Sequence, residues 1–311
     1  MYRPQKKSEF KLVRRRFLQK GLVASGVLAI GPGLWTSMTE GSSLRAANAT
    51  AVAGRKSNIP NLAGTLHEVA VDNDPATRML VPRGFSVREV ARTGQRAFPG
   101  SAYRWHGEPD GGAVFPMPDG GWVYVSNAEI GKPGQGGVGA LRFNATGEII
   151  DSYSICSGTT NNCAGGPTPW GTWLSCEEIN AGLVYECDPT GATAAVQVPA
   201  LGAFKHEAAA VDPVHKHIYL TEDTPDGNLY RFVPDHYPDN GRADLGSGRL
   251  EVAVVSGNNP SQTRAIQWMQ IPNPTPDLRT EAATRKQIQA AEKFDGGEGC
   301  WYHNGIVYFT T

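Results

Sequence analysis

The sequence lacks several short motifs that define common metal and nucleophile sites. It contains no C-x-x-C and no H-E-x-x-H, which excludes a zinc ribbon and a zincin. It also contains no G-x-S-x-G, so no serine nucleophile of that type is indicated. Residues 131–137 are rich in glycine, but they lack the G-K-[ST] ending of a phosphate-binding loop. We therefore interpret that segment as an ordinary loop.

An excess of positive charge is missing from most of the chain. Residues 54–311 contain 20 Lys and Arg against 28 Asp and Glu, a net charge of −8. A body this acidic is a poor partner for nucleic acid or an anionic membrane, so both classes are excluded. Residues 1–53 have the opposite balance, with nine basic and two acidic residues.

The basic N-terminal segment has the pattern of an export signal. Residues 14–20 read R-R-R-F-L-Q-K, which matches the twin-arginine motif, and a moderately apolar stretch follows at residues 21–35. At ~1.5 Å per residue that stretch is too short for a stable membrane span. Small residues at 47–49 and at 51–53 offer two cleavage positions. The rival interpretation is a basic, solvated tail.

These observations predict two parts of the chain. Residues 1–53 form the signal segment, recognised by the twin-arginine translocase, and residues 54–311 form the mature domain. We expect the protein to be periplasmic or secreted, and to be a monomer.

The composition of the body indicates many short strands. The chain has 37 Gly and 22 Pro, well above the usual share. Alternating apolar and polar segments recur, each typical of a half-buried strand. They are residues 122–129, 172–178, 217–223 and 306–311, with a second type at 139–144, 183–188 and 228–233 and a third, rich in small residues, at 111–116, 162–167, 205–212 and 295–301.

Successive segments of the first kind start about 50, 45 and 89 residues apart, the last near two periods. A period of ~40–50 residues with several strands per unit predicts an all-β fold, a β-propeller. The small residues of the third type suit innermost strands, where blades converge and space is least. A β-sandwich with seven to nine strands is the rival fold.

We count units that begin near residues 82, 111, 162, 205, 249 and 295. The last unit stops after its second strand, so we expect an incomplete propeller, less stable and less active than a longer version. The alternative is a smaller ring closed by the strands around residues 81–91. Residues 281–293 favour a helix, and we predict a helical insertion between blades there.

Acidic residues collect at one end of the predicted strands. Carboxylates brought together at one mouth of a propeller repel each other unless cations neutralise them. Oxygen ligands favour calcium, whereas the soft thiolate of Cys163 favours a transition metal such as iron. Solvated loop acids, and a small buried or disulfide-bonded Cys163, are the competing interpretations. The predicted metal ligands are Glu129, Cys163, Glu177, Glu178, Glu207, Glu222, Asp223 and Glu298.

The sequence has five cysteines, an odd number that leaves at least one thiol unpaired. Cys176 and Cys187 lie on consecutive strand segments of one unit, so a cross-strand contact between them is plausible. Folding in the reducing cytoplasm before export favours free thiols. We therefore expect no disulfide that folding requires.

Residues 162–178, N-C-A-G-G-P-T-P-W-G-T-W-L-S-C-E-E, resemble the most recognisable motif of the PhoX-type alkaline phosphatases. Residues 206–208, 219–223 and 297–299 resemble other motifs of that family in the same order, and residues 81–87 are similar to the segment that opens its propeller. The resemblance implies a six-bladed propeller with a mixed iron–calcium cluster that hydrolyses phosphate monoesters. It also implies that Cys163 is an iron ligand, with Glu177, Glu178, Glu207, Glu222 and Glu298 as further ligands.

The sequence also departs from the family pattern. Ala128 stands in Asn127-Ala128-Glu129 where many members have His, and the chain ends at Thr311 where members continue into further blades.

The resulting hypothesis is an exported, metal-dependent phosphomonoesterase that acts on a small phosphate ester. Arg104 and His106 are the candidate catalytic residues, because both could assist phosphate binding; a surface loop is the competing role for their segment. The alternative function is a calcium-binding propeller, either a lactonase-like hydrolase or a non-catalytic surface binding module.

Overall fold

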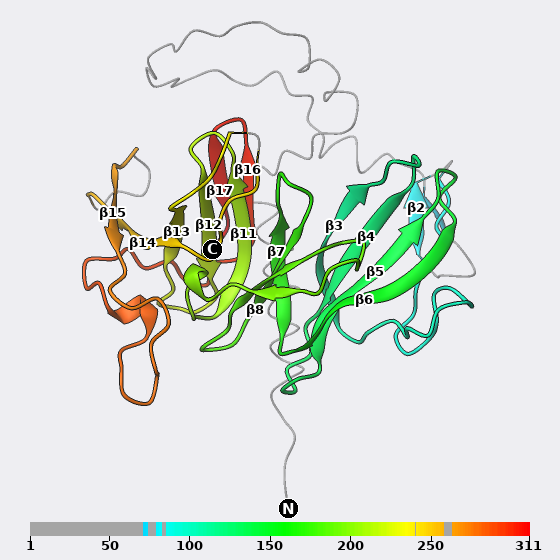
Figure 1. Ribbon diagram of the computed structural model, residues 1–311, viewed down its shortest axis with the longest axis horizontal. Coiled ribbons are helices and arrows are strands. Elements are labelled where there is room, and N and C mark those ends of the chain that lie inside the picture. The colour runs from blue at the N-terminus through cyan, green and yellow to red at the C-terminus, as the bar shows by residue number, and fades with distance from the viewer. Residues whose placement is uncertain (1–70, 74–78, 83–84, 240, 258–262) are drawn as a thin grey trace, which may run out of the picture. The chain divides into compact units, whose positions relative to one another are not determined.

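The structure is a computed structural model that describes residues 71–73, 79–82, 85–239, 241–257 and 263–311 (Figure 1). All of them belong to one compact unit, residues 70–311. The predicted signal segment, including the twin-arginine motif and both cleavage positions, lies outside the described residues. Among the residues that are described, no helix is long and apolar enough to span a membrane.

Three antiparallel sheets follow one another along the chain, each built from strands in sequence order. The first contains β3 (Pro109–Pro116), β4 (Trp122–Ala128), β5 (Gly136–Phe143) and β6 (Ile149–Thr159). The second contains β7 (Asn162–Pro167), β8 (Trp173–Glu177), β9 (Val184–Cys187) and β10 (Val196–Gln197). The third contains β11 (His206–Asp212), β12 (His217–Glu222), β13 (Leu229–Pro234), β14 (Gly248–Val255) and β15 (Ile266–Gln270).

Two hairpins complete the described strands. They are β1 (Val71–Asn73) with β2 (Leu80–Pro82), and β16 (Cys300–His303) with β17 (Ile306–Phe309). Two short 3-10 turns are also present, η2 (Pro199–Leu201) and η3 (Thr284–Lys286). The prediction of an all-β fold is confirmed, and sequential four-stranded meanders are the way propeller blades are built.

The first strands of the three sheets pack against one another. β7 lies beside β3 on one side and beside β11 on the other (Figure 1). A Cβ on Gly111 would lie 2.6 Å from the Cα of Ala164, and one on Gly166 would lie 1.9 Å from the carbonyl oxygen of Ala209. Side chains at these two positions would therefore force the sheets apart. This close approach is the physical reason for the small residues that mark these strands in the sequence.

Apolar side chains fill the spaces between the sheets. One cluster joins the first and second sheets through residues such as Val125 and Trp173, and a larger cluster joins the second and third through residues such as Leu174 and Tyr230. The alternation expected from the sequence produces these clusters: in β4, Val123 and Val125 are fully buried. A further cluster, with Ala208 and Cys300, packs β16 against β11.

The predicted unit that starts near residue 249 is wrong. β14 pairs with β13, and β15 pairs with β14, so both strands are outer strands of the third sheet. The 89-residue spacing consequently does not contain an additional sheet in the described residues. An alternating segment looks the same whether it starts a new sheet or extends an old one, because only the pairing partner differs.

The predicted helix at residues 281–293 is also wrong. The segment contains only η3, and its surroundings are turns and irregular backbone. Tertiary hydrogen bonds replace those of a helix: the Gln287 side chain accepts from the Asn273 amide at 2.9 Å and donates to the Asn273 carbonyl at 2.8 Å. Intrinsic helix propensity is a weak preference that such contacts override.

All five cysteines are buried free thiols. The expected contact between Cys176 and Cys187 is not formed by their strand register, since Cys176 lies opposite Val184 and Cys187 lies opposite Trp173. The two side chains belong to different apolar clusters.

Candidate metal centre

The antiparallel pairing of the first two strands in each sheet brings polar residues to one end. Pro109 lies opposite Ala128, Asn162 opposite Glu177, and His206 opposite Glu222. The residue that follows each first partner is Asp110, Cys163 or Glu207, and the residue that follows each second partner is Glu129, Glu178 or Asp223. We call these six residues the mouth set.

Five members of the mouth set form two overlapping groups of possible metal ligands. Asp110, Glu129 and Cys163 each offer a donor atom, and these atoms all lie within 4.8 Å of one another; the same holds for Cys163, Glu178 and Glu207. The Cys163 Sγ atom is 3.3 Å from Glu207 Oε1 and 3.6 Å from Asp110 Oδ1. The thiol therefore stands between the two groups and belongs to both.

The crowding of acidic groups shifts their protonation. Burial, followed by the charge of Glu178, raises the pKa of Glu207 to about 9. Burial raises the pKa of Glu178 to about 7, and a hydrogen bond with Asp223 acts in the same direction. Burial and the surrounding carboxylates, Glu207 foremost, also raise the pKa of the Cys163 thiol well above its usual range. Without a cation, these groups hold protons that a metal ion would displace.

Glu207 carries the clearest sign of a missing partner. The residue is 4% exposed, and its Oε2 atom is buried without a hydrogen-bond partner. A buried acceptor without a partner costs ~1–3 kcal/mol, and more when it is charged. A cation beside Oε2 would remove that penalty.

One lysine offsets part of the negative charge. Lys205 Nζ lies 2.7 Å from Glu178 Oε1 and 3.0 Å from Asp223 Oδ2. Lys205 directly precedes β11 and so reaches across to the ends of β8 and β12. Glu178 follows β8 of the second sheet and Asp223 follows β12 of the third, so Lys205 links the ends of these two sheets.

Asn127 holds the Cys163 strand in place. Its amide nitrogen donates to the carbonyl oxygens of Cys163 at 3.1 Å and Ala164 at 2.7 Å. Its amide oxygen accepts from Trp173 Nε1 at 2.9 Å and Ser175 Oγ at 3.0 Å. All these bonds run from the first sheet to the second, so Asn127 fixes where the shared thiol sits.

Glu177 and Glu222 make different contacts from the glutamates of the mouth set. Glu177 accepts hydrogen bonds from the backbone amides of Thr160 at 2.8 Å and Leu183 at 3.2 Å. Glu222 Oε2 accepts from the amide of Asn228 at 3.2 Å and the hydroxyl of Tyr230 at 2.8 Å. In both sheets the last residue of the second strand therefore closes the loop to the third strand. Their ligand role, implied by the resemblance, remains a prediction.

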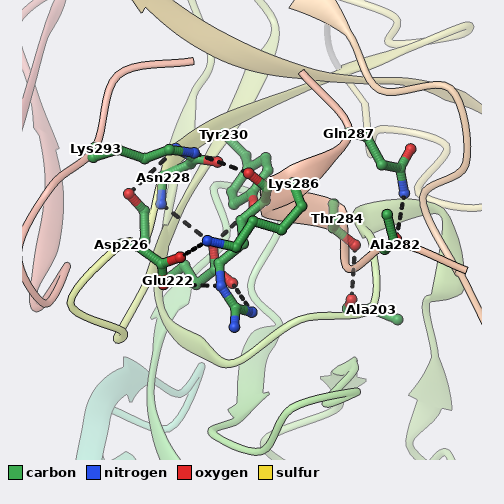
Figure 2. Close-up of polar contacts among 12 residues, drawn as sticks. Ala203, Glu222, Asp226, Asn228, Tyr230, Ala282, Thr284, Lys286, Gln287 and Lys293 are labelled. Carbon is green, nitrogen blue, oxygen red and sulfur yellow. Dashed lines mark hydrogen bonds and ion pairs between the residues drawn. The ribbon is translucent and has the colours of Figure 1, made fainter. Parts of the chain in front are cut away.

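Figure 2 shows the polar contacts around Glu222, where residues 282–293 dock onto the third sheet. Arg285 approaches Glu222 Oε1 at 3.3 Å and Asp226 Oδ1 at 3.0 Å, and Lys286 forms an ion pair with Asp226. Asn228 donates to the carbonyl oxygen of Glu292 at 2.6 Å. Glu222 is completely buried, and the guanidinium group of Arg285 is its ion-pair partner.

Glu298 lies next to the mouth set, just before β16. Its charge contributes to the raised pKa of Glu207. Thr221 Oγ1 donates to the Glu298 carbonyl at 2.6 Å and accepts from the Ala208 amide at 3.1 Å. The Thr221 hydroxyl therefore links the backbone of Glu298 to that of Ala208, the residue after Glu207.

The two candidate catalytic residues occupy different environments. His106 makes hydrogen bonds with Tyr103 Oη at 3.0 Å and Ser126 Oγ at 3.2 Å, and burial lowers its pKa to about 4. A Cβ on Gly139 would lie 2.7 Å from His106 Nδ1, so the glycine makes room for the ring. Arg104 is exposed and donates to the Gly94 carbonyl at 2.8 Å. His106 thus lies next to Asn127 in the first sheet, and Arg104 faces a loop.

Asp110 is the one member of the mouth set absent from the sequence predictions. It occupies the same register position as Cys163 and Glu207, the second residue of the first strand. Aligning the three units on their strand pairing, rather than on their motifs, would have identified it.

Comparisons with known proteins identify a family model and a solved structure that match this chain. The family model described as "Alkaline phosphatase PhoX" matches residues 137–186 and 179–311. A search of curated proteins finds no match. A solved structure, "Pseudomonas fluorescens PhoX in complex with vanadate, a transition state analogue", matches with a TM-score of 0.53 at 19% identity.

That match covers 65% of this chain and 57% of the Pseudomonas chain, so this chain spans little more than half of its length. At this identity the likeness shows a shared fold over the matched part. The family model, in contrast, covers more than half of this chain and includes Cys163, Glu178 and Glu207. The chain therefore belongs to the PhoX alkaline phosphatase family.

Proposed function

We propose that this protein is an exported phosphomonoesterase that uses a mixed iron–calcium cluster at the mouth of a β-propeller. The observation that carries the proposal is the shared thiol: Cys163 belongs to two carboxylate groups at once, and the neighbouring Glu207 has a buried oxygen without a partner. Membership of a phosphatase family supports the type of reaction.

The donor atoms fit such a cluster. Carboxylate oxygens from Asp110, Glu129, Glu178 and Glu207 suit a hard cation such as calcium. The Cys163 sulfur, once deprotonated, suits iron. Glu298 and Asp223 would add to the ligand set, because their charges already act on Glu207.

When bound, the cations would hold the phosphate oxygens and activate an oxygen nucleophile. The residues of this chain do the remaining work. Asn127 positions the Cys163 strand, and Lys205 holds Glu178 and Asp223 in place. His106 is neutral at pH 7 because burial lowers its pKa. To bind substrate, its ring would have to exchange its hydrogen bond with Tyr103 or Ser126 for one to a phosphate oxygen. Arg104 would contribute a positive charge at the approach to the mouth.

The arrangement of sheets supports the propeller. In this proposal β3–β6, β7–β10 and β11–β15 are three consecutive blades, and β16–β17 belong to the next one. The relative in the family is longer, and the six-bladed ring is proposed by analogy with the family. Export rests on the twin-arginine motif at residues 14–20, and we propose a monomer in the periplasm or outside the cell.

Replacement of Cys163 tests the proposal, with Cys300 as the matched control. Both thiols are buried and free, but Cys300 packs against Ala208 and Ala210 and lies outside both ligand groups. We expect Cys163→Ala to remove iron and to abolish hydrolysis of p-nitrophenyl phosphate. Cys300→Ala should keep both, and a chelator should abolish turnover in the unmodified protein.

Elemental analysis alongside the assay separates the competing functions. Unchanged iron content and activity in Cys163→Ala would refute the iron–calcium cluster. Calcium without iron, together with no phosphate-ester turnover, would instead support a lactonase-like enzyme or a binding module.

A further inference from the structure

Two buried thiols outside the mouth set contact each other across a sheet boundary. Cys156 lies on β6 of the first sheet and Cys187 on β9 of the second. β6 and β9 lie in contact across the sheet boundary, and the two thiols are close enough to affect each other's ionisation. Both belong to the apolar cluster that joins the two sheets. The pair therefore sits at the junction between two sheets that each contribute to the ligand groups.

The backbone around each thiol is held in a regular ladder. Cys156 is opposite Val138 of β5, and Cys187 is opposite Trp173 of β8. A disulfide bond would require the two sulfur atoms to approach to ~2.0 Å. A bond between them would close a loop that contains β7 and β8, and with them Cys163 and Glu178.

We propose that Cys156 and Cys187 form a reversible disulfide between the two sheets when the folded protein meets a hydroperoxide. This covalent link goes beyond the proposed phosphatase activity and does not depend on it. A small oxidant is required by the burial of the pair, since 7% of Cys156 and 0% of Cys187 is exposed.

The chemistry needs two steps. The Cys156 sulfur attacks the peroxide, whose O–O bond breaks, leaving a sulfenic acid and, after proton transfer, one water (or alcohol) molecule. The Cys187 sulfur then attacks the Cys156 sulfur, the S–O bond breaks, and a water molecule leaves with the Cys187 proton. Overall, the two thiols lose two electrons and two protons, and the peroxide is reduced.

The order of these steps follows from the environments of the thiols. Cys156 is the more exposed of the two, and the interaction with Cys187 lowers its pKa. Peroxide should therefore react first at Cys156.

Peptide mapping of the full 311-residue chain tests the proposal. The protein is treated with hydrogen peroxide, denatured, alkylated without reduction and digested. We expect one linked peptide pair that contains Cys156 and Cys187 and is released by dithiothreitol, with the other three cysteines alkylated. We also expect the oxidised protein to melt about 5 °C or more above the reduced protein.

Variants identify the partners. Cys156→Ser and Cys187→Ser should each lose the linked peptide, whereas Cys300→Ser, a change at another buried thiol, should keep it. In Cys187→Ser, dimedone should trap the sulfenic acid on Cys156. If a Ser variant fails to fold, mapping of the unmodified protein still decides. Separate alkylation of Cys156 and Cys187 after oxidation, or a bond to another cysteine, would overturn the proposal.

Discussion

At the scale of single residues, the second position of each first strand carries the donor atoms of the candidate metal centre. Asp110, Cys163 and Glu207 occupy this position in three consecutive sheets. Their neighbours across the ladder provide Glu129, Glu178 and Asp223. A repeated backbone thus carries these six side chains at equivalent positions, and five of them bring donor atoms together in two groups.

Asp110 is the member of this set whose role is easiest to isolate, because its carboxylate is exposed and contacts Cys163. We expect Asp110→Asn to lower metal affinity and phosphate-ester hydrolysis at least ~10-fold while leaving the fold intact, because one charge is lost from the ligand group. Metal titration and the p-nitrophenyl phosphate assay measure both effects. The control is Asp151→Asn, at an exposed position on β6; equal losses in the two variants would argue against a ligand role for Asp110.

The raised pKa of Glu207 predicts how the metal-free protein responds to pH. The folded state keeps its proton up to about pH 9, whereas the carboxyl group in the unfolded chain loses it near 4.5. Between these values the folded state binds more protons, so its stability falls as pH rises, by up to ~1.4 kcal/mol per pH unit for this group. Glu178, whose pKa is about 7, acts in the same direction over a narrower window.

Urea denaturation of the chelator-treated protein between about pH 5 and about pH 9 measures this dependence, because that pH range lies between the pKa values of Glu207 in the unfolded and folded states. Glu207→Gln should flatten the slope, because the amide does not titrate. Saturating calcium should reverse the loss of stability at high pH. A metal-free protein whose stability rises over this range would show that Glu207 ionises normally.

At the scale of elements, the two glutamates that end β8 and β12 organise loops. Glu177 and Glu222 each accept a hydrogen bond from the backbone amide just before the next strand. In the third sheet, residues 282–293 also dock at this position, and Arg285 forms an ion pair with Glu222. The segment predicted to be helical is thus a docked segment that forms an ion pair with a buried carboxylate.

The buried pair should matter far more than its exposed neighbour. Arg285→Met leaves the fully buried Glu222 charge without its cation, and we expect the free energy of unfolding to fall by about 3 kcal/mol. Lys286→Met removes a cation from a mostly exposed ion pair with Asp226, which is worth at most ~1 kcal/mol.

Urea denaturation of both variants tests this difference, and the double variant E222Q/R285M adds a check. The double variant should lose less stability than the sum of the losses for Glu222→Gln and Arg285→Met measured separately, since Glu222 and Arg285 act as a pair. Equal effects of Arg285→Met and Lys286→Met would contradict the inference.

At the scale of the whole described unit, the sheets depend on close backbone contact between their first strands. Gly166 of β7 has no space for a Cβ, because the Ala209 carbonyl oxygen of β11 would lie 1.9 Å away. The mouth groups are assembled across these same junctions. A change in how the sheets pack should consequently change the geometry of the candidate metal centre.

A methyl group at this junction should therefore destabilise the fold. We expect Gly166→Ala to lower the free energy of unfolding by about 2 kcal/mol or more through overpacking. Gly107→Ala is the control, because its nearest neighbour would be an ordinary 3.7 Å away, and it should change stability by less than ~0.5 kcal/mol. Melting temperatures of the two variants provide the comparison; similar values would show that the sheets can separate without penalty.

The sequence alone was sufficient to predict the family and the first three strands of each of the three sheets, but it did not predict β6, β10 or β15. Alternation and turn residues are local properties, so the first, second and third sheets could be recognised from segments such as residues 122–129. The acidic strand ends, with Cys163 among them, could be predicted because equivalent strand ends must meet. The seventeen-residue motif at 162–178 identified the PhoX relationship that the family model confirms.

Only the tertiary structure shows that Glu178, and not Glu177, lies beside Cys163. Glu177 and Glu178 are adjacent in sequence, yet one caps a loop and the other joins Cys163, because successive side chains of a strand point in opposite directions and the loop amides lie on one side only. Asp110, the place of β14 in the third sheet and the contact of Cys156 with Cys187 likewise depend on partners far away in the chain. Local patterns specify where strands form, but pairing between distant segments determines which side chains meet.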